Sequence, residues 1–359
     1  MRAPRIGIIG ARRRSQGIGQ HVARHLAALG GDVVAIVGTR PESVTAAQRE
    51  LSDRYTLQTR GYQSVEAMLA SEELDAIAIC SPPEFHRVHL HAALEHGVHV
   101  LCEKPLLFES GRDPEADARP IIEAFAASGK VLMANEQWPY TLSSFAELHP
   151  AAGLFKRPCE ALDVLLAPAE TGLAMIPSAL PHVLSLLLAL TPGGGAARAI
   201  KVACRDSAAQ MSLAFDYLHH EGVTHVSCLF RQALEQPRPA GYAINGHGAR
   251  RVIDMRDYSM ALESTVDIFA AAAAINHGPE TARRLPIEDP LVLLLRDFLA
   301  RIEIAQRRRP INPILLDSMR LLREVHAAAG HQLATTDDTQ TQASMSWTTR
   351  TPITTSAAS

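Results

Sequence analysis

Strand-type and helix-type segments alternate through the first 134 residues, and this alternation constrains the fold more than any other feature of the sequence. An apolar run from Arg5 ends at Gly10, and the next segment places Ile18, Val22 and Leu26 on one helical face. Further strand-type segments lie at residues 33–37, 75–80, 98–102 and 131–134, and helical segments lie at 65–69, 85–96 and 120–127. The first half therefore predicts an α/β domain with a doubly wound parallel sheet.

The pattern changes after about residue 137, where strand-type segments follow one another with few helices between them. These segments lie at residues 161–166, 200–205, 210–218, 223–230, 242–244 and 250–255. Asn245-Gly246 is the turn signal of a β-hairpin, and runs of strands after an α/β half predict a separate α+β domain. We expect a first domain at 1–137 and a second at 138–333 with a mostly antiparallel, open-faced sheet.

Helices complete the expected plan of the second half. One is expected at 175–190, one opens at Asp289-Pro290, and the last runs from about Pro313 and stops at Gly330. Residues 334–359 are dominated by Thr, Ser, Gln and Ala and have little to bury, so this tail is expected to be disordered.

Charge and cysteine usage exclude several classes of protein. The net charge is −3, so no overall positive field attracts nucleic acid. The five cysteines are scattered without a C-x-x-C pair, which indicates reduced thiols and no metal site. Strand character begins at Ile6, too early for a signal peptide, and the richest apolar run, 183–190, is far shorter than the ~18 residues of a membrane span. We expect a cytoplasmic protein that binds neither membrane nor nucleic acid.

A glycine-containing turn follows the first strand, where sheets of this kind bind dinucleotides. Six residues separate Gly10 from Gly17, so the spacing is longer than in the usual G-x-G-x-x-G fingerprint. Backbone N–H groups at the start of the next helix are expected to hold a pyrophosphate. The residues assigned to this cofactor site are Gly10, Ala11, Arg12, Gly17, Ile18 and Gly19.

The residues after the second strand bear on the choice of cofactor. An Asp or Glu there would bind the adenosine ribose of NAD and repel a 2′-phosphate, but this chain has Gly38-Thr39-Arg40. A hydroxyl and a guanidinium suit a phosphate, because arginine presents a planar fork of donors. The alternative is a solvated loop arginine. We favour NADP(H) over NAD, with Thr39 and Arg40 as contacts.

The apolar segment from Val98 ends in Glu103-Lys104-Pro105 without a turn residue. Pro105 cannot donate to a β-ladder and restrains Lys104 to extended geometry, so the strand stops there. Lys104 is therefore expected to project from the carboxyl end of a strand, which is the ligand side of an open α/β sheet.

The segments follow one another in the order strand, Ser81-Pro82-Pro83, helix, Gly97, strand and Glu103-Lys104-Pro105. This order resembles that of the Gfo/Idh/MocA family of oxidoreductases. The resemblance covers about residues 5 to 330 and implies a Rossmann domain in which Ser81, Pro82, Glu103 and Lys104 lie beside the nicotinamide. It also implies terminal helices that pack back on this domain. One face of the second sheet commonly joins subunits in the family, which implies a homodimer or homotetramer.

The helix at 175–190 departs from the family pattern. Members typically show Asp-x-x-x-His-x-x-Asp there, with the first Asp and the His on one helical face. This chain has His182 at the histidine position and Ser178 and Ser185 at the acidic ones. The resemblance implies Lys104 and His182 as catalytic residues, with Gln137, Trp138 and Ser178 as substrate contacts. A core histidine and hinge packing of Trp138 stay open as alternatives.

The leading hypothesis is an NADP(H)-dependent oxidoreductase that transfers a hydride to or from a carbinol, carbonyl or imine carbon of a small polar substrate. Lys104 would stabilise charge on the reacting oxygen, and His182 would supply or remove the proton, as general acid in the reductive direction. The family acts mostly on sugars and cyclitols, so these are the expected substrates. A nucleotide-binding sensor or scaffold without turnover is the alternative, and a reductase for an imine or enone is a third possibility.

Overall fold

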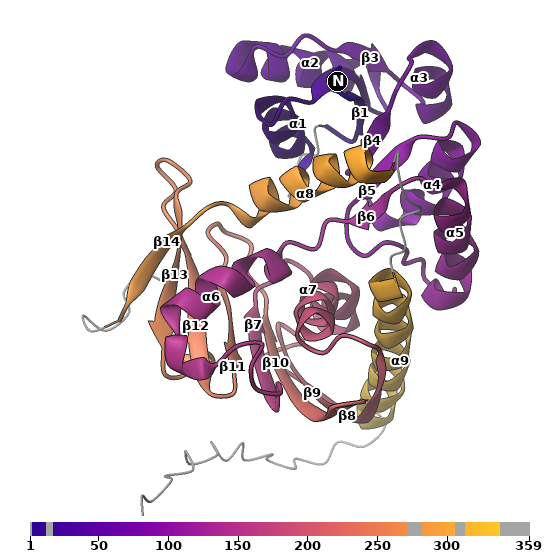
Figure 1. Ribbon diagram of the computed structural model, residues 1–359. Helices are drawn as coiled ribbons and strands as arrows, with labels where there is room; N and C mark the ends of the chain where they lie inside the picture. Colours follow the sequence, from indigo (N-terminus) through magenta and orange to yellow (C-terminus); the bar gives the residue numbers. More distant parts are fainter. Residues whose placement is uncertain (1, 12–16, 271–281, 306–312, 338–359) are drawn as a thin grey trace, which may run out of the picture.

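The computed structural model describes residues 2–11, 17–270, 282–305 and 313–337, which are built around two sheets (Figure 1). The first sheet is parallel, with the strand order β3-β2-β1-β4-β5-β6. Its strands are β1 (Arg5–Ile9), β2 (Asp32–Val37), β3 (Arg60–Tyr62), β4 (Ala76–Ile79), β5 (His99–Cys102) and β6 (Leu132–Ala134). The chain winds one way from β1 to β3 and the other way from β4 to β6. The carboxyl ends of β1 and β4 therefore flank the switch point at which such sheets bind ligands.

Helices on both faces of this sheet confirm the predicted doubly wound class. They are α1 (Gly19–Ala28), α2 (Pro41–Tyr55), α3 (Val65–Ser71), α4 (His86–Glu95) and α5 (Pro114–Ser128). The predicted start of α5 near Pro120 was wrong. Asp113 caps the helix by accepting hydrogen bonds from the N–H groups of Glu115 and Ala116, and Pro114 takes the first helical position. Pro120 lies inside the helix.

The second sheet has the order β14-β13-β12-β11-β7-β10-β9-β8, and only its β7–β10 pair is parallel among the described residues. Its strands are β7 (Ala161–Leu166), β8 (Gly195–Arg205), β9 (Gln210–His219), β10 (Gly222–Arg231), β11 (Ala240–Ile244), β12 (His247–Ile253), β13 (Met260–Thr265) and β14 (Arg284–Ile287). Asn245 and Gly246 form the predicted hairpin turn, both with positive φ. The strands β13 and β14 and the short helix α6 (Leu142–Leu148) were not predicted.

The helix α7 (Met175–Leu190) lies on the covered face of the second sheet and has the predicted bounds (Figure 1). Alternate residues of β9, from Met211 to Tyr217, are buried in the same core, which confirms the expected alternation of a sheet with one covered face. By length and composition alone, Gly172–Leu190 could cross a membrane, although 61% of its apolar window is buried within the protein. No other described helix meets that test.

Two terminal helices pack on helices of the first domain. The first, α8 (Pro290–Ala305), packs on α1, and the second, α9 (Pro313–Asp337), lies between α5, α7 and β8. The predicted stop of α9 at Gly330 was wrong. Gln332 accepts from the N–H of Val202 and donates to the carbonyl of Ile200, so contacts with β8 extend the helix past the glycine. Residues 334–337 are therefore helical, and the rest of the predicted tail lies outside the described residues.

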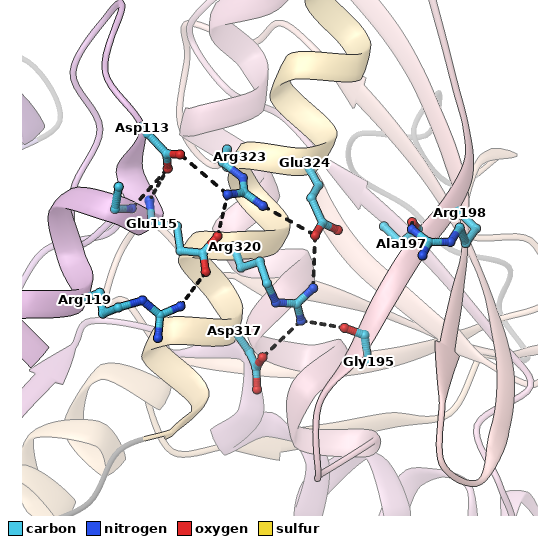
Figure 2. A network of polar contacts seen from close by, with 11 residues as sticks. Asp113, Glu115, Arg119, Gly195, Ala197, Arg198, Asp317, Arg320, Arg323 and Glu324 are labelled. Atoms are coloured by element: carbon cyan, nitrogen blue, oxygen red, sulfur yellow. Dashed lines mark hydrogen bonds and ion pairs between the residues drawn. The ribbon is translucent and has the colours of Figure 1, made fainter. Parts of the chain in front are cut away.

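Charged side chains join α9 to both domains (Figure 2). Arg323 pairs with Glu115 of α5 at 2.7 Å, and Arg320 donates to the carbonyl of Gly195 at the start of β8. Because α9 also packs on α7, these contacts hold α7 in a defined position relative to the first sheet.

Candidate functional site

The turn after β1 fits a dinucleotide pyrophosphate. A Cβ atom at Gly10, where φ is +80°, would lie 2.9 Å from the carbonyl oxygen of Cys80, and one at Gly19 would lie 2.5 Å from the carbonyl oxygen of Gly10. Only glycine permits these close approaches. Ala11 is buried, Gly17 and Ile18 lead directly into α1, and the first turn of α1 carries no acidic residue. Its free N–H groups therefore suit an anion. The predicted contact Arg12 lies outside the described residues.

The predicted phosphate contacts lie at the carboxyl end of β2. Thr39 and Arg40 are both exposed and directly precede α2, for which Arg40 occupies the N-cap position. A guanidinium at this helix start lies on the same sheet edge as Gly10, because β1 and β2 are paired in parallel up to Val37.

A cavity of about 640 Å³ separates the carboxyl edge of the first sheet from the second domain. Eight of the predicted site residues line it: Ile18, Ser81, Glu103, Lys104, Gln137, Trp138, Ser178 and His182. The structure therefore brings the strand-end lysine and the α7 histidine to one cavity, although 78 positions separate them in the chain. Pro82 borders this group in sequence and does not line the cavity.

Lys104 spans the two domains. Its Nζ donates a hydrogen bond of 2.6 Å to the carbonyl oxygen of Ser178, in the first turn of α7. The preceding residue, Glu103, accepts from the amide of Asn135, and the amide of Gln137 donates to Asn135 at 3.1 Å. This chain of contacts holds Lys104 and Gln137 at one end of the cavity.

Glu170 is a site residue that sequence reasoning missed. It lies in the loop after β7 and accepts a hydrogen bond of 2.7 Å from the hydroxyl of Ser178. A carboxylate therefore lines the same cavity as Lys104, and both side chains contact Ser178, although the helix itself has serine at the expected acidic position. The loop carries no periodic pattern or motif that points to Glu170, because the contact depends on how the loop folds over α7.

His182 has the environment of a neutral imidazole. Its ring lies edge-on to Trp138, with 6.4 Å between centroids, and its Nδ1 is shielded from solvent with no hydrogen-bond partner among the described residues. Burial, together with the positive charges of Lys104 and Arg251, holds the pKa of His182 well below its usual value. A neutral ring can accept a proton, as a general base does when a substrate hydroxyl is oxidised, and the reverse of that step is the expected role as general acid in reduction.

Several other residues have structural roles. The buried His86 contacts the carbonyls of Ser81 and Pro105, so it bridges the loops after β4 and β5 as a packing histidine. The hydroxyl of Ser185 donates to the carbonyl of His182 and lies outside the cavity. Trp138 lines the cavity, whereas Tyr140 donates to Asp297 of α8 at 2.6 Å and belongs to the packing between domains. No cluster of metal-binding side chains occurs in the described parts of the chain.

The comparison with known proteins decides the identity of the first domain. Residues 4–136 match the model of an oxidoreductase family with an NAD-binding Rossmann fold, Gfo/Idh/MocA. The first domain belongs to this family. It contains both the glycine turn and Glu103-Lys104-Pro105, which confirms the resemblance seen in the sequence.

Curated relatives match a stretch of similar length. A 1,5-anhydro-D-fructose reductase from Ensifer adhaerens is 32% identical over 131 residues, which are 36% of this chain and 35% of that protein. A D-glucoside 3-dehydrogenase from Escherichia coli (strain K12) is 31% identical over 128 residues, which are 36% of this chain and 33% of the dehydrogenase. The chain thus matches about a third of the length of these relatives.

Solved structures extend the similarity in fold to both domains. A UDP-N-acetylglucosamine 3-dehydrogenase from Acidithiobacillus ferrooxidans has a TM-score of 0.60 at 22% identity, over 92% of this chain and 96% of that one. A 3-ketoreductase from Actinomadura kijaniata, solved with NADP, has a TM-score of 0.62 at 16% identity over 90% of this chain and 97% of that one. At these identities the similarity shows the two-domain fold alone.

Proposed function

We propose that this protein is an NAD(P)-dependent oxidoreductase that acts on a small polar substrate, a sugar, a cyclitol or a related carbonyl or imine compound. The observation that carries the proposal is the cavity in which Lys104 and His182 meet at the carboxyl edge of a dinucleotide-binding sheet. Curated relatives that match about a third of the chain are named as sugar and inositol dehydrogenases and reductases, which supports this substrate class.

The residues of the turn after β1 would hold the pyrophosphate, and Ser81, Pro82 and Glu103 would border the nicotinamide. When bound, the nicotinamide accepts or donates the hydride. Lys104 would move its Nζ hydrogen bond from the carbonyl of Ser178 to the reacting oxygen of the substrate and stabilise charge there. His182 would accept the hydroxyl proton, which its neutral state permits. Gln137, Trp138 and Ser178 would position the substrate from the cavity wall.

The preferred cofactor is proposed to be NADP(H). Arg40→Ala is expected to weaken NADPH binding by about 1.5–3 kcal/mol, the usual contribution of a hydrogen bond to a charged group, and to leave NADH binding almost unchanged. Fluorescence titration of both cofactors measures this, with Arg49→Ala as a matched control, because Arg49 is an exposed arginine further along α2. A wild-type preference for NADH would contradict the proposal.

The protein is also proposed to form a homodimer or homotetramer through the second sheet. The face opposite α7 and α9 carries Ala214 and Ser227 at paired positions, an ion pair of Asp216 and His225, and the apolar side chains Leu218 and Val223, which are more than 40% exposed. Such a surface is rarely left in water. Light scattering at micromolar concentration is expected to give a multiple of 38.9 kDa, and Ala214→Arg is expected to shift the mass toward that of one chain. A 38.9 kDa species alone in the wild type would refute this.

The protein is further proposed to be cytoplasmic and to bind neither nucleic acid nor membrane. The free cysteines, four of which are buried, support a reducing compartment. The net charge of −3 gives no support to a nucleic-acid partner.

A further inference from the structure

The wall of the cavity formed by the second domain carries two arginines that the proposed reaction does not use. Arg238 lies in the loop ahead of β11, and Arg251 lies on β12. The Nε atoms of both are buried and have no hydrogen-bond partner in the described part of the chain. Together with Nδ1 of His182, they are three of the eight buried side-chain polar atoms that lack a partner among the described residues, and all three belong to residues that line this one cavity.

Two carboxylates that line the cavity accept hydrogen bonds from residues other than these arginines. Glu103 accepts from Asn135, and Glu170 accepts from Ser178. Asp289 raises the pKa of Arg251, but this carboxylate caps α8 by accepting from the N–H of Leu291. Within the residues that the structure covers, no carboxylate lies within 4.0 Å of the guanidinium of Arg238 or Arg251. The remaining acid of the cavity, Glu84, is exposed on the first domain.

Two half-buried arginines whose Nε atoms are shielded from solvent, with no carboxylate within 4.0 Å among the described residues, are unfavourable unless a ligand supplies the charge. Burial lowers the pKa of Arg251, which reflects this cost, yet arginine stays protonated in proteins. The one polar contact between the pair, from Arg251 Nη2 to the carbonyl of Arg238, is long at 3.4 Å and neutralises no charge. The forked donors of both side chains therefore remain available to a planar or tetrahedral anion.

Trp138 relates this pair to the proposed reaction centre. The guanidinium of Arg251 lies over the Trp138 ring at 5.6 Å, and the His182 ring lies 6.4 Å from the same indole. The distance between the His182 ring centroid and the guanidinium carbon of Arg251 therefore cannot exceed the sum of these two distances. A sugar ring that carries a charged substituent is short enough to contact both side chains within this limit.

We infer that Arg251 and Arg238 form an anion-binding subsite, and that the substrate is a sugar or cyclitol derivative bearing a carboxylate or a phosphoryl group. The reacting carbon lies at the His182 end, and the acidic group lies at the Arg251 end. The position of the reacting carbon rests on the proposed function, whereas binding of the acidic group does not.

The test compares neutral and acidic partners of the same ring. Glucose, glucuronate and glucose 6-phosphate form one set, and myo-inositol and inositol 1-phosphate form another. Calorimetric titration of the full chain saturated with NADPH measures binding, and reduction of NADP measures turnover. An acidic member is expected to bind at least tenfold more tightly than its neutral partner, and the two acidic groups separate carboxylate from phosphoryl recognition.

Arg251→Met is expected to lower the affinity for the acidic ligand by roughly 10–100-fold and to change the affinity for its neutral partner by less than about threefold. Arg251→Lys should restore part of the loss, and Arg49→Met, on an exposed arginine of α2, should cause none. Equal effects on both ligands, a preference for the neutral members, or no binding of any acidic member would overturn the inference. Selective binding without turnover would retain the subsite and contradict the proposed function instead.

Discussion

Lys104→Ala is expected to reduce turnover by at least about 10²–10³-fold while NADPH affinity changes by less than a few fold. The ammonium group reaches the cavity from the end of β5 and already donates to the carbonyl of Ser178. A substrate oxygen that gains charge in the transition state would be a stronger acceptor than that carbonyl. The hydrogen bond is therefore stronger in the transition state than in the ground state, and it contributes little to the affinity for the cofactor. Steady-state rates and a fluorescence titration of NADPH measure the two quantities separately.

Lys104→Met is the matched control for packing, because it keeps the apolar stem and removes the charge. It should lose as much activity as Lys104→Ala. Unaltered turnover in Lys104→Met would show that the ammonium has no part in the chemistry. The sensor or scaffold alternative expects no turnover in the wild type across a broad panel of sugars, cyclitols and imines, with NADPH binding intact.

His182→Ala is expected to lower the rate of substrate oxidation by roughly 10²–10⁴-fold, the usual contribution of a general base. The neutral imidazole is the active form, so activity falls as pH decreases through the pKa of His182. Because burial and the charges of Lys104 and Arg251 depress that pKa, the acid limb of the wild-type profile is expected below pH 6.5. The variant should lose this limb.

Ser185→Ala provides a control on the same helix. Its hydroxyl contacts the backbone of His182 and lies outside the cavity, so the rate should stay within a few fold of the wild type. An acid limb that persists in His182→Ala would assign the titration to another group. A limb above pH 6.5 in the wild type would contradict the electrostatic environment described for His182.

The sequence by itself determined the class of the first domain and the place of Lys104. Both depend on local chemistry: apolar periodicity separates strands from helices, Gly10 permits a close approach of backbones, and Pro105 ends a strand. The hairpin at Asn245-Gly246 followed from the same kind of signal, because its turn requires two residues with positive φ.

Only the tertiary structure added Glu170, Arg238 and Arg251 to the residues that face the cavity from the second domain. Glu170, Arg238 and Arg251 come from two loops and a strand, and none belongs to a motif. The same reason explains why α9 continues past Gly330, where Gln332 bonds to β8 and outweighs a local stop signal. Local patterns specify secondary structure within a few residues, whereas contacts between distant segments depend on how the finished elements pack.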